Sequence, residues 1–150
     1  MINIQMHQNK KMQPIQYHST NNPEHRVNFE TALLRGLAPD YGLYTLHRAD
    51  IPRLSPELIG RMREMSYAQI AFQVVNPFIG AEIPEKELKA LLKDAYSEDK
   101  IPTRMQHVVD KRHVIDNLYI MWLTNGPTYS FKDYAARFYA RALNYFLGKR

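Results

Sequence analysis

The sequence contains no cysteine, no long apolar run and no segment typical of a secretory signal. Without cysteine, a disulfide framework, a thiolate metal site, an iron–sulfur cluster and a cysteine nucleophile are all excluded. The longest apolar run, Leu118–Leu123, is far shorter than the roughly 20 residues that span a bilayer. The amino terminus carries lysines but no apolar region behind them, which does not fit a signal peptide. We therefore expect a cytoplasmic protein with no membrane partner.

Length and composition are those of an ordinary globular domain. The chain has 150 residues, of which 45% are hydrophobic and 23% are charged, so disorder of the whole chain is not expected. The net charge of +5 is compatible with an anionic ligand or a nucleic acid but selects neither. The six histidines include no pair four residues apart, so no metal site is predicted. Basic residues are spread along the chain without an interleaved aromatic motif, so a nucleic acid is not the expected partner.

Capping and stop residues predict a mostly helical chain that follows a flexible extension, residues 1–16. Asn28 is a candidate cap and Gly36 a stop for a short helix, and Ser55 followed by proline begins another. Pro77 is expected to end a third helix. The predicted helices cover about 29–35, 55–65, 66–75, 84–95 and 131–147.

The remaining segments are predicted to be strands or connections. Turn residues at 39–42, flanked by leucines, favour a small strand or hairpin. Residues 96–117 show weak patterning and are interpreted as a long irregular connection. The continuous apolar run 118–123 ends at Asn-Gly-Pro and predicts a buried strand. A strand, a loop and a helix therefore make up the carboxyl-terminal third.

The last predicted helix places Lys132 on its apolar side. On a wheel of about 100° per residue, Arg137 and Arg141 fall in a solvated polar arc, whereas Tyr139 lies within about 40° of Lys132. Residues 130–133 have the spacing of a helix-capping pattern, which puts Lys132 in the first turn. There the helix dipole and partial burial disfavour an ammonium, and a neutral amine can attack a carbonyl. The helix start and the turn before it also offer backbone N–H groups to an anion such as a phosphate.

An ordinary explanation of these residues stays open on the pattern alone. A lysine near a helix end commonly lays its stem on apolar surface and sends its head to water. Thr128 and Ser130 equally fit the roles of turn and cap residues. Periodicity therefore does not choose between a Schiff-base lysine and a surface lysine.

Several segments in order along the chain resemble one enzyme family. Residues 126–133, Gly-Pro-Thr-Tyr-Ser-Phe-Lys-Asp, resemble the lysine motif of threonine synthase, Gly-Pro-Thr-x-(Ala/Ser)-Phe-Lys-Asp. Residues 29–40, Phe-Glu-Thr-Ala-Leu-Leu-Arg-Gly-Leu-Ala-Pro-Asp, resemble a second segment of that family, and Tyr17–Thr20 resembles its amino-terminal strand. Shorter matches lie between them, so the resemblance covers roughly residues 17–150. The chain is similar to the amino-terminal part of threonine synthase.

This resemblance implies a fold and a domain organisation. The fold would be α+β, mostly helical, and would form the amino-terminal portion of a type II pyridoxal-phosphate enzyme of the tryptophan synthase β-like kind. Residues 17–103 would form the amino-terminal domain of the family. Residues 104–150 would begin its pyridoxal-phosphate domain.

The resemblance also implies a reaction and a site. Lys132 would hold pyridoxal 5'-phosphate as a Schiff base in a lyase that converts O-phospho-L-homoserine and water to L-threonine and phosphate. Thr128 and Asn125 are candidate contacts of the cofactor or substrate, and Asp133 and Ser130 would hold the helix start.

Two alternatives to a catalytic chain remain. The chain could be a folding, assembly or regulatory fragment without turnover, because the family's groups for the cofactor phosphate and ring come largely from segments beyond the lysine motif. We therefore expect the 150-residue chain alone to be incomplete and inactive. A basic helical domain that binds nucleic acid is the less favoured alternative.

Overall fold

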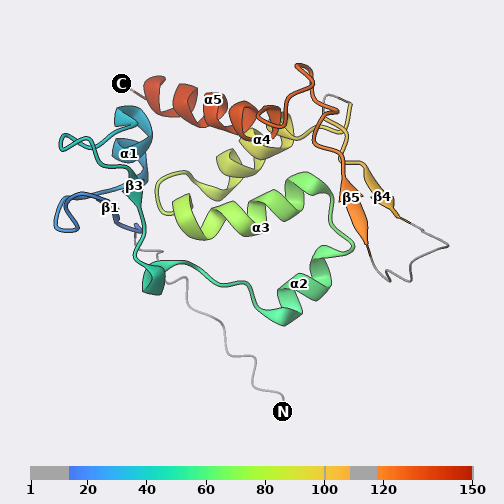
Figure 1. Cartoon of the computed structure of the whole chain (residues 1–150), viewed down its shortest axis with the longest axis horizontal. Helices are drawn as coiled ribbons and strands as arrows, with labels where there is room; N and C mark the ends of the chain where they lie inside the picture. Colours follow the sequence, from blue (N-terminus) through green and yellow to red (C-terminus); the bar gives the residue numbers. More distant parts are fainter. Residues whose placement is uncertain (1–13, 100, 109–117, 150) are drawn as a thin grey trace, which may run out of the picture. The chain divides into compact units, whose positions relative to one another are not determined.

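The computed structural model describes residues 14–99, 101–108 and 118–149, so the predicted extension lies almost wholly outside the described residues. The chain divides into two compact units. Unit 1 contains residues 1–54 and 74–85, and unit 2 contains residues 55–73 and 86–150. The mixture of helices and small sheets confirms the predicted α+β class (Figure 1).

Unit 1 is built on a three-stranded antiparallel sheet with the strand order β2-β1-β3. β1 (Tyr17–Ser19) pairs with β2 (Arg26–Val27) on one side and with β3 (Tyr44–Thr45) on the other. A short 3-10 helix, η1 (Arg48–Asp50), follows β3. Leu37 and Leu43 form an isolated bridge, which confirms the small hairpin predicted around residues 39–42.

Helix α1 (Phe29–Arg35) in unit 1 confirms the predicted cap and stop. The Asn28 side chain accepts the N–H of Thr31 at 3.1 Å, and Gly36 ends the helix with a φ of 74°. The carboxylate of Glu82 also accepts the first two N–H groups of α1, at 2.8 and 3.0 Å. A residue far along the chain therefore supplies acceptors that the helix start needs.

Unit 2 contains α2 (Pro56–Met62), most of α4 (Glu85–Ala95) and α5 (Asp133–Leu147). Ser55 caps α2 by accepting the N–H of Leu58 at 3.2 Å, as the sequence predicts. Figure 1 shows α5 running alongside α4. Among the residues of this unit that the structure describes, the buried apolar side chains are those of Phe72, Leu88, Leu92, Ala95, Ile101, Tyr134, Ala142 and Phe146.

Helix α3 (Tyr67–Ile79) corrects the predicted end at Pro77. Proline removes its own N–H and disturbs the bond to the carbonyl four residues earlier, but Pro77 lies in the last turn, where only one such bond is lost. The N–H of Gly80 then bonds to the carbonyl of Asn76 at 2.8 Å and closes that turn. The helix therefore continues through the proline.

A hairpin in unit 2 corrects two further expectations. β4 (Met105–His107) lies in the segment predicted to be irregular, and it pairs antiparallel with β5 (Tyr119–Met121). The sequence places β5 correctly but not its burial, because all three of its residues are exposed. Within the part of the chain that the structure describes, the sheet has these two strands alone. A strand with one neighbour and no covering layer stays open to solvent.

Candidate cofactor-lysine site

Lys132 lies at the start of α5, directly after a tight turn. Its carbonyl accepts the N–H groups of Ala135 and Ala136 at 3.1 and 2.8 Å, so the helical hydrogen bonds begin at this residue. Its side chain is exposed, which differs from the predicted partial burial. The apolar neighbours Phe131 and Tyr139 are 64% and 51% exposed, so Lys132 lies beside uncovered apolar side chains at the start of the helix.

Asp133 holds the turn before the lysine. Its carboxylate accepts the backbone N–H of Thr128 at 2.8 Å and the Thr128 hydroxyl at 2.7 Å, and the residue is only 8% exposed. A Cβ atom on Gly126 would lie 2.7 Å from the Cβ of Asp133. This distance is too short for two carbon atoms that are not bonded to each other, so this position needs glycine. The structure thus brings Gly126, Thr128 and Asp133 together around the backbone of Lys132.

The turn uses its own backbone donors. Tyr129 adopts a left-handed φ of 59° and donates its N–H to the Gly126 carbonyl at 3.0 Å. The Ser130 hydroxyl accepts the N–H of Lys132 at 3.2 Å, and the Ser130 carbonyl accepts that of Asp133 at 3.1 Å. The predicted side-chain cap from Ser130 to the Asp133 N–H does not form, because α5 begins after Lys132. The N–H groups of Thr128, Tyr129 and Lys132 are therefore engaged within the turn, and the Asp133 carboxylate is the anion that accepts the N–H of Thr128.

The other two predicted site residues lie on the same turn. Asn125 is half-buried and donates its side-chain N–H to the Trp122 carbonyl at 3.4 Å, which ties it to the end of the hairpin. Thr128 is exposed, and its hydroxyl is directed to Asp133. Contact of either residue with a cofactor stays a prediction.

Tyr134 is a positioning residue that the sequence reasoning missed. Its hydroxyl lies 3.2 Å from the carbonyls of both Pro102 and Trp122, which flank β4 and β5. Its own carbonyl accepts the hydroxyl of Tyr96 at 2.8 Å. The second residue after Lys132 is therefore tied to the segment before β4 and to the segment after β5, which meet at one end of the strand pair. The sequence did contain a signal for this role, because Tyr134 lies on the helix face that was predicted to be buried. A buried tyrosine hydroxyl needs a hydrogen-bond partner, so such contacts could have been expected.

A cluster of tyrosines in unit 2, Tyr67, Tyr96 and Tyr134, keeps its hydroxyls protonated near neutral pH. Tyr67 packs edge-on against Tyr96 and Tyr134, with ring centroids 5.0 and 6.2 Å apart. Burial, and then the neighbouring Tyr67, raises the pKa of Tyr96 to about 12. Burial also raises the pKa of Tyr67 and of Tyr134. The hydroxyls of Tyr96 and Tyr134 act as hydrogen-bond donors beside the turn.

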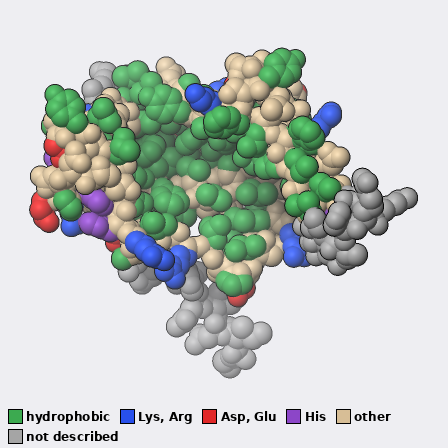
Figure 2. All heavy atoms as spheres, viewed as in Figure 1, with side chains coloured by type: hydrophobic (Ala, Val, Ile, Leu, Met, Phe, Trp, Pro, Cys, Tyr) green, Lys and Arg blue, Asp and Glu red, His purple; other side chains and the backbone are tan. Residues whose placement is uncertain are grey.

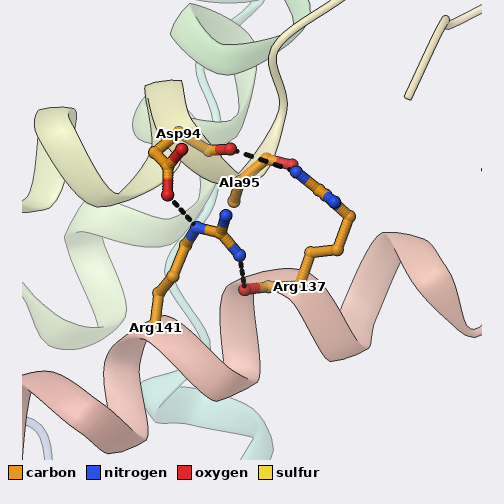
Figure 3. A network of polar contacts seen from close by, with 4 residues as sticks. All are labelled: Asp94, Ala95, Arg137 and Arg141. Atoms are coloured by element: carbon orange, nitrogen blue, oxygen red, sulfur yellow. Dashed lines mark hydrogen bonds and ion pairs between the residues drawn. The ribbon is translucent and has the colours of Figure 1, made fainter. Parts of the chain in front are cut away.

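Two arginines of α5 bind the end of α4 instead of forming a solvated arc. Arg137 donates to the carbonyls of Ala95 and Asp94 at 2.6 and 3.3 Å (Figure 3). Arg141 pairs with the Asp94 carboxylate at 2.6 Å and donates to the Arg137 carbonyl at 2.9 Å. Cations at the carboxyl end of a helix complement its dipole and satisfy its last carbonyls. These contacts hold the helix that follows Lys132.

The described residues offer neither a metal site nor a membrane span. No group of three histidine or acidic side chains there has an arrangement that could hold a metal ion. No helix in those ranges combines the length and the apolar character needed to cross a membrane.

Comparison with known proteins identifies relatives over most of the chain. The family model described as "Threonine synthase N terminus" matches residues 16–96, more than half of the chain. Threonine synthase of Pseudomonas aeruginosa is 33% identical over 136 residues, which cover 91% of this chain and 28% of that protein. Threonine synthase of Saccharomyces cerevisiae is 35% identical over 130 residues, which cover 81% of this chain and 24% of that protein.

A solved structure agrees with these matches. The crystal structure of pyridoxal-phosphate-bound threonine synthase from Brucella melitensis is similar with a TM-score of 0.78 and 31% identity. It covers 91% of this chain and 28% of that chain. This chain thus spans about a quarter of the length of its relatives. The chain belongs to the threonine synthase family and corresponds to its amino-terminal part.

Proposed function

We propose that this chain supplies the cofactor lysine of a threonine synthase, with Lys132 as the Schiff-base residue for pyridoxal 5'-phosphate. The observation that carries the proposal is the turn at residues 126–133, whose internal hydrogen bonds fix the backbone and leave the Lys132 side chain exposed. A reactive lysine needs this combination, because its backbone must be placed while its amine stays accessible.

The residues of the turn suit the carbonyl end of the cofactor better than its phosphate end. The exposed amine of Lys132 suits the carbonyl of pyridoxal phosphate, and the related Brucella protein is described as bound to this cofactor. The phosphate finds no donors at Thr128, Tyr129 or Lys132, because the N–H groups of these residues are already engaged. The phosphate would then depend on donors other than these three N–H groups.

The proposed reaction breaks the bond between the γ-carbon and the phosphate ester oxygen of O-phospho-L-homoserine, so that phosphate leaves. A β-hydrogen is lost as a proton, the hydroxyl of water adds to the β-carbon, and the γ-carbon gains a proton and becomes the methyl group of threonine. The bound cofactor supplies an electron sink for the carbanion character that develops during this change. The Nζ atom of Lys132 would carry protons at the substrate carbons. Asp133 and Thr128 would keep the lysine backbone in place, and Asn125 and Thr128 are the candidate contacts near the cofactor.

We propose that the chain alone has weak or no turnover. Two observations support this. Backbone N–H groups of the lysine turn are bonded within the turn, and the chain spans about a quarter of the length of its relatives. A purely non-catalytic role in folding, assembly or regulation is the alternative.

A chimera tests the proposal. Residues 17–150 would replace the matched segment of the P. aeruginosa enzyme, and phosphate release and threonine formation would be measured together with O-phospho-L-homoserine as substrate. We expect equal amounts of both products, loss of both in Lys132→Arg, and unchanged turnover in the matched control Lys86→Arg, whose side chain is exposed on α4. A folded chimera that retains turnover in Lys132→Arg would contradict the assignment.

A further inference from the structure

A cavity in unit 2 lies between the first half of α3 and the exposed side of α4. Its volume of about 520 Å³ falls within the range of about 300–1,000 Å³ that is typical of small-molecule sites. Lys89 and Lys93 line it from α4, and Phe72 and Gln73 line it from α3. All of its lining residues belong to unit 2, and none belongs to the turn at 126–133. The cavity therefore shares no residue with the cofactor-lysine site.

The floor of the cavity is apolar. Phe72 is only 8% exposed, and Met65 lines the cavity just before the start of α3. Hydrophobic side chains also gather at the surface over α3 (Figure 2). An aromatic ring packs well against another ring, and the flexible side chain of methionine adapts to the shape of an apolar ligand. The floor therefore suits a flat apolar or aromatic body.

The charged lining of the cavity is cationic. Lys89 and Lys93 are one helical turn apart, so their side chains leave the same face of α4 and can approach a single anionic group. The Lys89 ammonium lies over the Phe72 ring, with Nζ 4.7 Å from the ring centroid, which places positive charge above the apolar floor. Among the described residues, the lining includes no acidic side chain. The cavity therefore favours an anion.

Ser66 and Gln69 form part of the rim of the cavity at the start of α3. The Gln69 side-chain oxygen accepts the N–H of Ser66 at 2.8 Å, and the Ser66 hydroxyl accepts the N–H of Gln69 at 3.4 Å. This reciprocal capping holds both side chains at the helix start. The bond uses the oxygen of the Gln69 amide and not its NH₂ donors. The rim therefore adds hydrogen-bond donors to the two ammonium groups.

We propose that this cavity binds a small organic anion that carries an apolar, preferably aromatic, body. Lys89 and Lys93 bind the carboxylate or phosphate group, and Phe72 and Met65 contact the body. The lysine pair accepts either head group, because an ammonium binds both as a point charge. This inference goes beyond the proposed function and does not depend on it, because the cavity and the lysine turn have no residue in common.

Titration of the ¹⁵N-labelled 150-residue chain with 2-naphthoate tests the proposal, with amide chemical shifts as the readout. 2-Naphthyl phosphate compares the head group, 2-naphthalenemethanol supplies the body without a charge, and inorganic phosphate supplies charge without the body. We expect saturable shifts at residues 65–73 and 89–93, with a Kd of about 1 mM or tighter for at least one aromatic anion. The alcohol and inorganic phosphate should each bind at least about tenfold more weakly, because each lacks one set of contacts.

Two variants and the chimera locate the binding. Lys93→Gln removes an ammonium from the cavity but keeps a good helix former, and it should weaken binding of the aromatic anion at least about fivefold. The control Lys132→Gln makes the same change at an exposed lysine outside the cavity, and it should alter the Kd less than about twofold. The amide spectra also report whether each variant is folded. The chimera of residues 17–150 with the P. aeruginosa enzyme should bind the same probe.

Several results would overturn the proposal. A cavity filled by water only would give no saturable shift with either aromatic anion. Equal affinity for the alcohol, or shifts centred on residues 119–123, would show apolar adsorption without a charge-selective site. Equal effects of Lys93→Gln and Lys132→Gln would exclude the lysine pair, and loss of binding in the chimera would exclude the site from the longer protein. None of these readouts needs cofactor or turnover, so their failure leaves the proposed function standing.

Discussion

Replacing Asp133 with asparagine tests whether the carboxylate holds the lysine turn. Asparagine keeps the size of the side chain but offers one oxygen acceptor where the carboxylate offers two, so one of the two bonds from Thr128 is lost. A hydrogen bond to a charged group contributes about 1.5–3 kcal/mol. Thr128 is exposed and regains water in the variant, so we expect a loss at the lower end, about 1.5–2 kcal/mol.

Urea unfolding followed by Trp122 fluorescence measures this loss, because Trp122 belongs to the same unit as Asp133. With a denaturant dependence of about 2 kcal/mol per molar urea, the midpoint of unfolding should fall by about 1 M. The control Asp99→Asn makes the same chemical change at an exposed position of the unit and should stay within about 0.5 kcal/mol of the parent. An Asp133→Asn midpoint equal to that of the control would refute the reasoning.

Three further changes test other supports. Glu82→Gln removes one of the two acceptors at the start of α1, and it should speed hydrogen exchange of the Phe29 or the Glu30 amide several-fold. Unchanged rates at both amides would contradict this role. Tyr134→Phe should lower the free energy of unfolding by about 0.5–1.5 kcal/mol, because the hydroxyl contacts with the Pro102 and Trp122 carbonyls are lost. Urea unfolding followed by Trp122 fluorescence measures this loss, and an unchanged midpoint would argue against these hydrogen bonds. Burial raises the pKa of Tyr96 from 10.0 to about 12, so the folded state binds the hydroxyl proton more tightly than the unfolded state does. The free energy of unfolding should therefore fall as the pH rises from 10 to about 12. Titration of stability in Tyr96→Phe should show a shallower fall, and an identical pH dependence would show that Tyr96 is not the group responsible.

Helix starts and stops were predictable because their signals are local. Asn28 and Gly36 lie at the ends of α1, and Ser55 caps α2, so adjacent residues carry the information. Pro77 misled the prediction because a proline in a last turn costs the helix little more than one hydrogen bond. Local sequence therefore places an element better than it places the element's end.

Contacts between distant residues were not predictable. Glu82 lies 53 residues from Phe29, and no local pattern indicates that its carboxylate accepts the N–H groups of α1. β4 lacks an apolar pattern and becomes recognisable only through its pairing with β5. The periodicity of α5 placed Arg137 among solvated side chains, although it binds the carbonyl end of α4.

The lysine motif was placed correctly, whereas its surroundings were not. The sequence located Lys132 at the start of a helix and predicted that Asp133 holds that start, which the bonds to Thr128 confirm. It did not predict that Lys132 would be exposed, because periodicity shows which residues share a face but not what covers that face. The hydroxyl contacts of Tyr134 also depend on the hairpin, which local patterns did not reveal.

The most direct test of the account is to map the cofactor-bearing lysine. The chimera described above would be loaded with pyridoxal 5'-phosphate, reduced with borohydride, digested and examined by mass spectrometry. The account predicts that the pyridoxyl-phosphate mass lies on Lys132 and disappears in Lys132→Arg, whereas Lys86→Arg leaves it in place. A stable modification at any other lysine of the folded chimera, with Lys132 unmodified, would contradict the assignment.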